Sequence, residues 1–91
     1  MDISKKLLQA SQAGNIRQVM EILAEGADVN VRDGNGYTPL HWAVQEGYVG
    51  LAKLLMAKRA NPNSADNEGF TPLGIACTKN HLNIVGNTLA L

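Results

Sequence analysis

The sequence predicts an all-α protein built from a repeated unit, and three observations support this prediction. Residues 33–47, DGNGYTPLHWAVQEG, combine a turn, a helix start and an apolar helical face. The same arrangement returns at residues 66–80 as DNEGFTPLGIACTKN. Hydrophobic residues make up 45% of the chain and charged residues 18%, which is typical of a globular protein and not of a disordered one.

Residue types within 33–47 account for both the turn and the helix start. Gly34 and Gly36 flank Asn35, and glycine tolerates the positive φ values that a tight hairpin turn requires. Thr38 can cap a helix with its hydroxyl, and Pro39 suits the first helical position, where its missing N–H costs nothing. Apolar and small residues then follow at helical spacing: Leu40, Ala43, Val44 and Gly47.

A shift of the chain by 33 places extends the match beyond these turns. The shift pairs Tyr37 with Phe70 and repeats the tripeptide Thr-Pro-Leu at 38–40 and 71–73. Chance does not explain so many matches at one offset, and 91 residues hold nearly three such units. The repeat therefore determines the predicted architecture.

These residues resemble the ankyrin repeat, whose pattern is D-x-x-G-x-T-P-L-H-x-A-A…G…GADVN. The resemblance covers essentially the whole chain and is most specific in the middle unit, residues 33–65. It implies a hairpin-like loop followed by two antiparallel helices in each unit, stacked into a curved solenoid. It also implies a non-enzymatic function, the recognition of a protein partner through the concave face and the hairpin tips.

We expect one domain, residues 1–91, with units at 1–32, 33–65 and 66–91. The first unit lacks the TPLH tetrapeptide and is predicted to be an N-terminal capping repeat, because a solenoid end needs polar substitutions. The third unit is predicted to be a C-terminal, partial or capping repeat with a second helix near Leu82. Truncation of a longer array explains its drift from the pattern equally well.

Helices are expected in pairs within each unit. In the first unit, Asp2 or Ser4 caps the first helix, and Gly26 supplies a left-handed stop after the second. In the second unit, the helices are expected at 39–46 and 49–58.

The exit of the second unit departs from that of the first. The first unit ends in GADVN and the second in RANPN, so Arg59 occupies the position of Gly26. A non-glycine residue in a left-handed conformation costs on the order of 1 kcal/mol. The alignment therefore predicts that Arg59→Gly stabilises the protein.

Charge and composition argue against several kinds of partner. Eight basic and eight acidic residues cancel, whereas a nucleic-acid or anionic-membrane binder usually carries a basic excess or a basic face. Lys53, Lys58 and Arg59 form a small basic cluster that lacks aromatic partners for bases, so we expect a solvated face. No apolar run approaches the length of a membrane span. The single cysteine, Cys77, requires no oxidising compartment, so an intracellular, cytoplasmic setting is expected by default.

No catalytic, cofactor-binding or metal-binding residue is predicted. His41, Cys77 and His81 lack the spacing of a zinc site, and structural zinc needs four ligands. A nucleophile needs a base oriented by a third group, and no such arrangement is present in the sequence. The resemblance implies instead that His41 hydrogen-bonds near the helix start and stiffens the turn. Gly74 at the equivalent place in the third unit indicates a network local to the second unit.

The residues that the repeat pattern leaves unassigned are the candidate partner-binding positions, because the turn, the cap and the apolar stripe do not require them. The resemblance places such positions along the concave groove and at the hairpin tips. We predict the following contact residues: Arg32, Asn35, Tyr37, Gln45, Glu46, Asn67, Glu68, Phe70, Thr78 and Lys79. Tyr37 and Phe70 are the candidate anchors, since aromatic side chains supply large contact area at modest entropy cost. Alternatively, they pack across neighbouring hairpins, and Trp42 is expected to pack between helices.

Two functions remain open from the sequence. The first is a binding module for a protein partner whose identity depends on surface detail. The second is a minimal engineered or truncated repeat scaffold without its own partner. A monomer is favoured, but an apolar C-terminal face could pair two copies through these residues: Leu82, Val85, Leu89 and Leu91.

Overall fold

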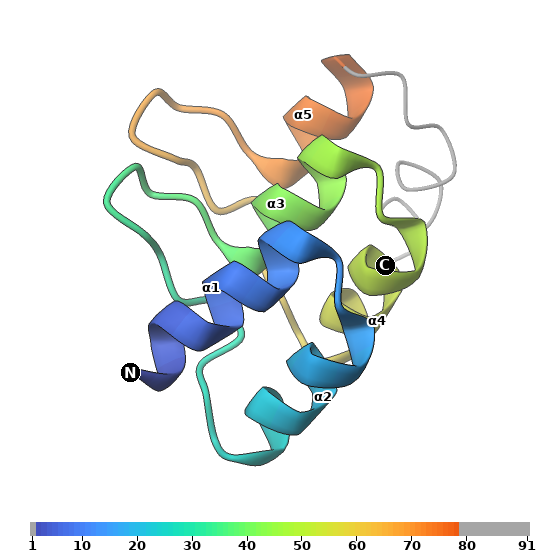
Figure 1. The fold of residues 1–91 in the computed structure, drawn as a ribbon. Coiled ribbons are helices and arrows are strands. Elements are labelled where there is room, and N and C mark those ends of the chain that lie inside the picture. The colour runs from blue at the N-terminus through green and yellow to red at the C-terminus, as the bar shows by residue number, and fades with distance from the viewer. Residues whose placement is uncertain (1, 79–91) are drawn as a thin grey trace.

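The computed structural model describes residues 2–78, which form α-helices joined by loops (Figure 1). The helices of this part are α1 (Ile3–Ala13), α2 (Ile16–Ala24), α3 (Pro39–Glu46), α4 (Val49–Ala57) and α5 (Pro72–Thr78). No strand occurs in residues 2–78, so the all-α class is confirmed, and the hairpin-like loops are turns without paired strands. The helix expected near Leu82 and the face from Leu82 to Leu91 lie outside the described residues.

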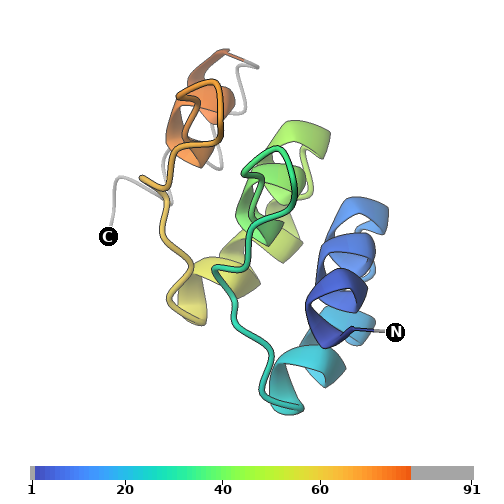
Figure 2. The same cartoon turned by 90° about the vertical axis from the view of Figure 1, so that its left-hand side faces the viewer.

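The helices stack in layers, as the repeat predicts. Helix α3 packs against α1 on one side and against α5 on the other, while α2 and α4 contact each other beside this row. Figure 2 shows the layers side by side, with α1 and α2 in one, α3 and α4 in the next, and α5 beyond them. The first loop (residues 25–38) and the second loop (residues 58–71) project from the same side of the stack (Figure 1).

Caps define the helix ends, and those of α1 and α3 are residues that the sequence indicated. Asp2 caps α1, and its carboxylate accepts a hydrogen bond of 2.9 Å from the backbone N–H two residues on. Asn15 caps α2, and Thr38 caps α3 with Pro39 as the first helical residue. Gly47 ends α3 with φ of +75°, the left-handed conformation that glycine adopts without strain.

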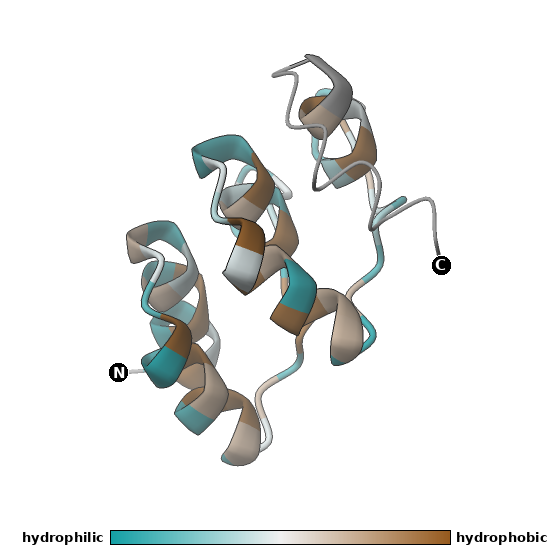
Figure 3. Ribbon diagram, turned by 90° about the vertical axis from the view of Figure 1, so that its right-hand side faces the viewer, coloured by the Kyte–Doolittle hydropathy of each residue, from teal (hydrophilic) through white to brown (hydrophobic). Residues whose placement is uncertain are grey.

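The core lies between the layers. Leu7 of α1, Leu40 of α3 and Leu55 of α4 are fully buried, and Ile75 carries the core into α5. Burial of a leucine contributes about 1.5–3 kcal/mol, so these contacts are the main stabilisation of a stack with short helices. Figure 3 shows hydrophobic segments in every layer, alternating with hydrophilic segments along the helices.

Arg59 has φ of +70°, and it is the one non-glycine residue with positive φ in the described part of the chain. Gly26, its counterpart one unit earlier, has φ of +99°. The left-handed conformation that the alignment predicted for this position is therefore confirmed. The side chain of Arg59 makes no hydrogen bond or ion pair within residues 2–78, and its carbonyl accepts from Asn30, a contact that glycine would keep.

Arg59→Gly is expected to raise the free energy of unfolding by about 1 kcal/mol, because it relieves left-handed strain and removes no side-chain partner. Urea or thermal unfolding measures the change. Lys58→Gly is the control, since Lys58 has φ of −92° and offers no such strain to relieve. Unchanged or lower stability of Arg59→Gly would contradict the prediction.

Candidate functional site

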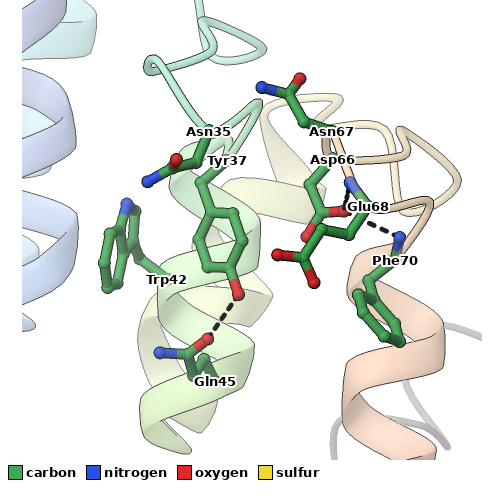
Figure 4. Close-up of a pocket in the computed structure, with 8 residues that line it drawn as sticks. All are labelled: Asn35, Tyr37, Trp42, Gln45, Asp66, Asn67, Glu68 and Phe70. Carbon is green, nitrogen blue, oxygen red and sulfur yellow. Dashed lines mark hydrogen bonds between the residues drawn. The ribbon is translucent and has the colours of Figure 1, made fainter.

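A pocket of about 320 Å³ lies between the first loop, helix α3 and the second loop (Figure 4). We call it the inter-loop pocket, and its lining residues are Asn35, Tyr37, Trp42, Gln45, Asp66, Asn67, Glu68 and Phe70. Six of these eight are among the predicted contact residues. The other two are Trp42, which was expected to pack between helices, and Asp66, which belongs to the repeat pattern.

Equivalent turns in the two loops place the aromatic side chains of the pocket. The Oδ1 atom of Asp33 accepts hydrogen bonds of 2.8 and 2.9 Å from the N–H groups two and four residues further on. Asp66 repeats this arrangement in the second loop, with two distances of 2.9 Å. Such side-chain-to-backbone bonds specify a turn. Tyr37 and Phe70 therefore leave their loops at equivalent points, one repeat apart.

Tyr37 is held from three sides. Its ring stacks on His41 with 4.9 Å between centroids, and it meets Trp42 edge-on with centroids 5.0 Å apart. Its hydroxyl donates a hydrogen bond of 2.7 Å to Oε1 of Gln45 (Figure 4). Tyr37 thus packs within its own unit, and Trp42 is half-buried on the pocket wall. Phe70 is 51% exposed at the pocket wall, and its packing across to the neighbouring loop stays a prediction.

The inter-loop pocket has an acidic lining. Burial raises the pKa of the Tyr37 phenol, and the carboxylates of Asp66, Glu68 and Asp33 raise it further. Tyr37 therefore remains a neutral hydrogen-bond donor at physiological pH. The lining residues include no lysine or arginine.

His41 joins helix α3 to the second loop. The ring is fully buried, and its Nδ1 accepts from the Thr38 N–H at 3.1 Å. Because Nδ1 is the acceptor, Nε2 carries the hydrogen and donates to the Phe70 carbonyl at 2.9 Å. Burial lowers the pKa of His41, which keeps the ring neutral. The expected hydrogen bonding of His41 near the helix start is confirmed, whereas the expectation of a network local to the second unit is wrong, because the bond to Phe70 crosses to the third.

Arg32 and Asn67 tie the two loops together. The Arg32 guanidinium donates to the Gly36 carbonyl at 3.3 Å and to the Ala65 carbonyl at 2.9 Å. Asn67 donates from its side-chain amide to the Gly34 carbonyl at 2.9 Å. Arg32 was not expected to take part in the turn, but its guanidinium contacts the backbone of both loops. A role for either residue in partner binding remains a prediction.

The other predicted contact residues lie away from the inter-loop pocket or beyond the described structure. Glu46 is exposed at the end of α3 and does not line the pocket. The side chain of Thr78 and all of Lys79 lie outside the described residues, as do the side chain of Cys77 and all of His81.

Among residues 2–78, no group of three or more His, Cys, Asp and Glu side chains is placed to hold a metal ion. None of the helices in this part of the chain combines the length and the apolar character that a membrane crossing demands.

Paired helices stacked in layers, with turn-rich loops on one side, define a helical repeat protein. A family model for ankyrin repeats in three copies matches residues 7–86. The chain belongs to the ankyrin-repeat family.

Curated relatives share part of this repeat region. The chain is 44% identical over 48 residues to Protein VAPYRIN-LIKE of Medicago truncatula. The matched segment covers 53% of the chain and 10% of that protein. It is 45% identical over 53 residues to Ankyrin repeat domain-containing protein 49 of Drosophila melanogaster, and this match covers 57% of the chain and 25% of that protein. It is also 45% identical over 49 residues to mouse 2-5A-dependent ribonuclease, and this match covers 53% of the chain and 7% of that protein. The matched segment thus spans a quarter or less of each of these relatives. Ankyrin repeats generally mediate protein–protein interaction.

Proposed function

We propose that this chain is a non-enzymatic interaction module that binds a protein partner through the concave face, with the inter-loop pocket at the centre of the contact. The observation that carries the proposal is Phe70, a large apolar side chain that is 51% exposed at the pocket wall. Exposed aromatic side chains beside a concave site are typical of interface anchors. The predicted contact residues that line the pocket form the core of the proposed interface.

Preorganisation of Tyr37 supports this role. Stacking on His41 and the hydrogen bond to Gln45 hold the ring in one orientation before any partner arrives. Ordering a side chain on binding costs about 0.5–1.5 kcal/mol, and a ring already held avoids most of that cost. Tyr37 can therefore add contact area with little entropic penalty.

The engagement of His41 supports a non-enzymatic function. Both ring nitrogens are used by the backbone, one by the Thr38 N–H and the other by the Phe70 carbonyl. A general base needs a nitrogen within reach of the proton that it removes. His41 offers none to the inter-loop pocket, so its neutral ring has a structural task.

Phe70→Ala tests the proposal. A tagged wild-type chain and the variant are used to capture partners from a lysate of the source cells, and the affinity for each captured protein is then measured. A genuine partner is expected to bind Phe70→Ala at least about tenfold more weakly, because an interface anchor is removed. Circular dichroism should be unchanged, since the side chain is half exposed.

Met20→Ala is the matched control, because Met20 is 52% exposed on α2, away from the inter-loop pocket. Non-specific hydrophobic capture would fall to a similar extent in both variants. Equal binding by Phe70→Ala and the wild type would contradict the proposed interface.

A further inference from the structure

We infer that the inter-loop pocket accepts an arginine side chain from the protein partner, so that the partner presents a basic segment to the two loops. This inference rests on the proposed function and specifies the chemistry of the partner. It follows from the charge of the pocket, an unsatisfied carboxylate oxygen and the aromatic walls.

The charge of the inter-loop pocket has one sign. Asp66 and Glu68 both line it, and no lysine or arginine does. Arg32 acts electrostatically on the nearby His41, but its guanidinium donates to the carbonyls of Gly36 and Ala65. Glu68 forms no ion pair within residues 2–78. A cation can therefore meet two carboxylates here without displacing a charged protein partner.

Asp66 has an oxygen without a donor. The side chain is only 8% exposed, and its Oδ1 accepts from the N–H groups of Glu68 and Phe70. Its Oδ2 has no hydrogen-bond partner in the described part of the chain, and Figure 4 shows this oxygen on the side of Tyr37. An oxygen of this carboxylate is therefore available to accept from a charged N–H group that enters the pocket. A neutral apolar side chain offers no such donor.

The walls suit a guanidinium in particular. Tyr37, Trp42 and Phe70 supply the aromatic surface of the pocket, and in Figure 4 the Glu68 carboxylate lies between the rings of Tyr37 and Phe70. A guanidinium is planar, stacks on aromatic faces and presents a fork of N–H donors that matches carboxylates. An ammonium is a compact, strongly hydrated point charge and uses such walls less well. A volume of about 320 Å³ is at the small end for ligand pockets and suits one side chain.

The probe is N-acetyl-L-arginine amide, with N-acetyl-L-citrulline amide as its uncharged counterpart of the same shape. Trp42 is the only tryptophan and lines the pocket, so its fluorescence reports occupancy, as do the backbone NMR shifts of Gly69 and Phe70. We expect the arginine compound to bind with a dissociation constant of roughly 1–10 mM, as befits one side chain. The citrulline compound should bind at least about fivefold more weakly, because it lacks the charge.

Two variants and one control localise the effect. Glu68→Gln is expected to weaken arginine binding about two- to fivefold, the range for an exposed ion pair. Asp66→Asn keeps an oxygen for the turn but replaces the unpaired oxygen with an amide donor, so it should weaken binding more. Glu25→Gln, an exposed carboxylate at the end of α2, should leave binding unchanged. Circular dichroism of each variant establishes that it is folded.

Each result bears on the inference in one direction. Preference for arginine over citrulline, reduced in Glu68→Gln and kept in Glu25→Gln, supports it. Equal binding of the two compounds, or wild-type affinity in Glu68→Gln, overturns it. A partner whose capture depends on Phe70 but not on Glu68 would leave the proposed function standing and reject the basic segment. If the pocket binds the arginine compound but no captured partner depends on Phe70, the arginine preference of the pocket stands and the proposed function is rejected.

Discussion

Gly36→Ala is expected to lower the free energy of unfolding by about 2–4 kcal/mol, the sum of left-handed strain and forced overpacking. Gly36 is buried with φ of +80°, a conformation that residues with a Cβ rarely adopt. A Cβ at this position would lie 2.8 Å from the backbone nitrogen of Asn67 and 2.7 Å from the Arg32 guanidinium. The backbone atom cannot yield without moving the second loop. Chemical denaturation measures the loss.

Gly69→Ala is the matched control for this prediction. Gly69 holds the same position one unit later, with φ of +88°, but a Cβ there meets nothing within 4 Å. Its expected cost is about 1–2 kcal/mol, which is strain alone. The difference between the two variants isolates the contact between loops, so equal losses would show that this contact does not constrain the stack.

His41→Ala is the second variant with a large expected effect, a loss of about 2–4 kcal/mol of unfolding free energy. It removes a fully buried ring, and it leaves the Thr38 N–H and the Phe70 carbonyl without their partner. Tyr37 also loses the ring on which it stacks. The loss should therefore loosen the inter-loop pocket as well as helix α3. A wild-type unfolding midpoint for His41→Ala would contradict this structural role.

The pH dependence of stability tests the same residue in the unmodified chain. Burial lowers the folded-state pKa of His41, so the unfolded chain, with an ordinary pKa of about 6.5, binds the proton more readily. The stabilisation is thus fully present above the unfolded pKa. It is lost as the pH falls through about 6.5 toward the lower folded pKa, with a slope of at most ~1.4 kcal/mol per pH unit for one proton.

Subtraction of the His41→Ala curve from the wild-type curve between pH 8 and 5 isolates this group, because all other side chains are common to both proteins. A flat difference would show that His41 has the same proton affinity in the folded and unfolded states.

Interactions between residues close in sequence predicted many of the helix boundaries and turns. Thr38 and Pro39 marked the start of α3 because capping and the fixed φ of proline act within a few residues. The 33-residue offset carried the conformation of Gly26 over to Arg59, and the structure has both in the left-handed region. The inference worked because equal sequence positions in a repeat stack experience nearly equal surroundings.

The missed features are those that depend on contacts between units. Trp42 was assigned to packing between helices, and the structure adds a place for it on the wall of the inter-loop pocket, which the second loop completes. Arg32 was assigned to the free surface, yet it reaches a carbonyl 33 residues away. The bond from Arg32 to Ala65 could not follow from a single repeat, because it depends on the distance between neighbouring loops.

The sequence by itself determined the repeat, the helix starts and stops and the identity of most residues that now line the pocket. The tertiary structure alone decided that these residues meet, that Asp66 joins them with one oxygen unpaired, and that His41 bonds to Phe70 across two units. The physical reason is the distance along the chain over which each interaction acts. Caps, turns and apolar spacing act over a few residues, whereas a pocket between loops depends on how closely the core lets one unit approach the next.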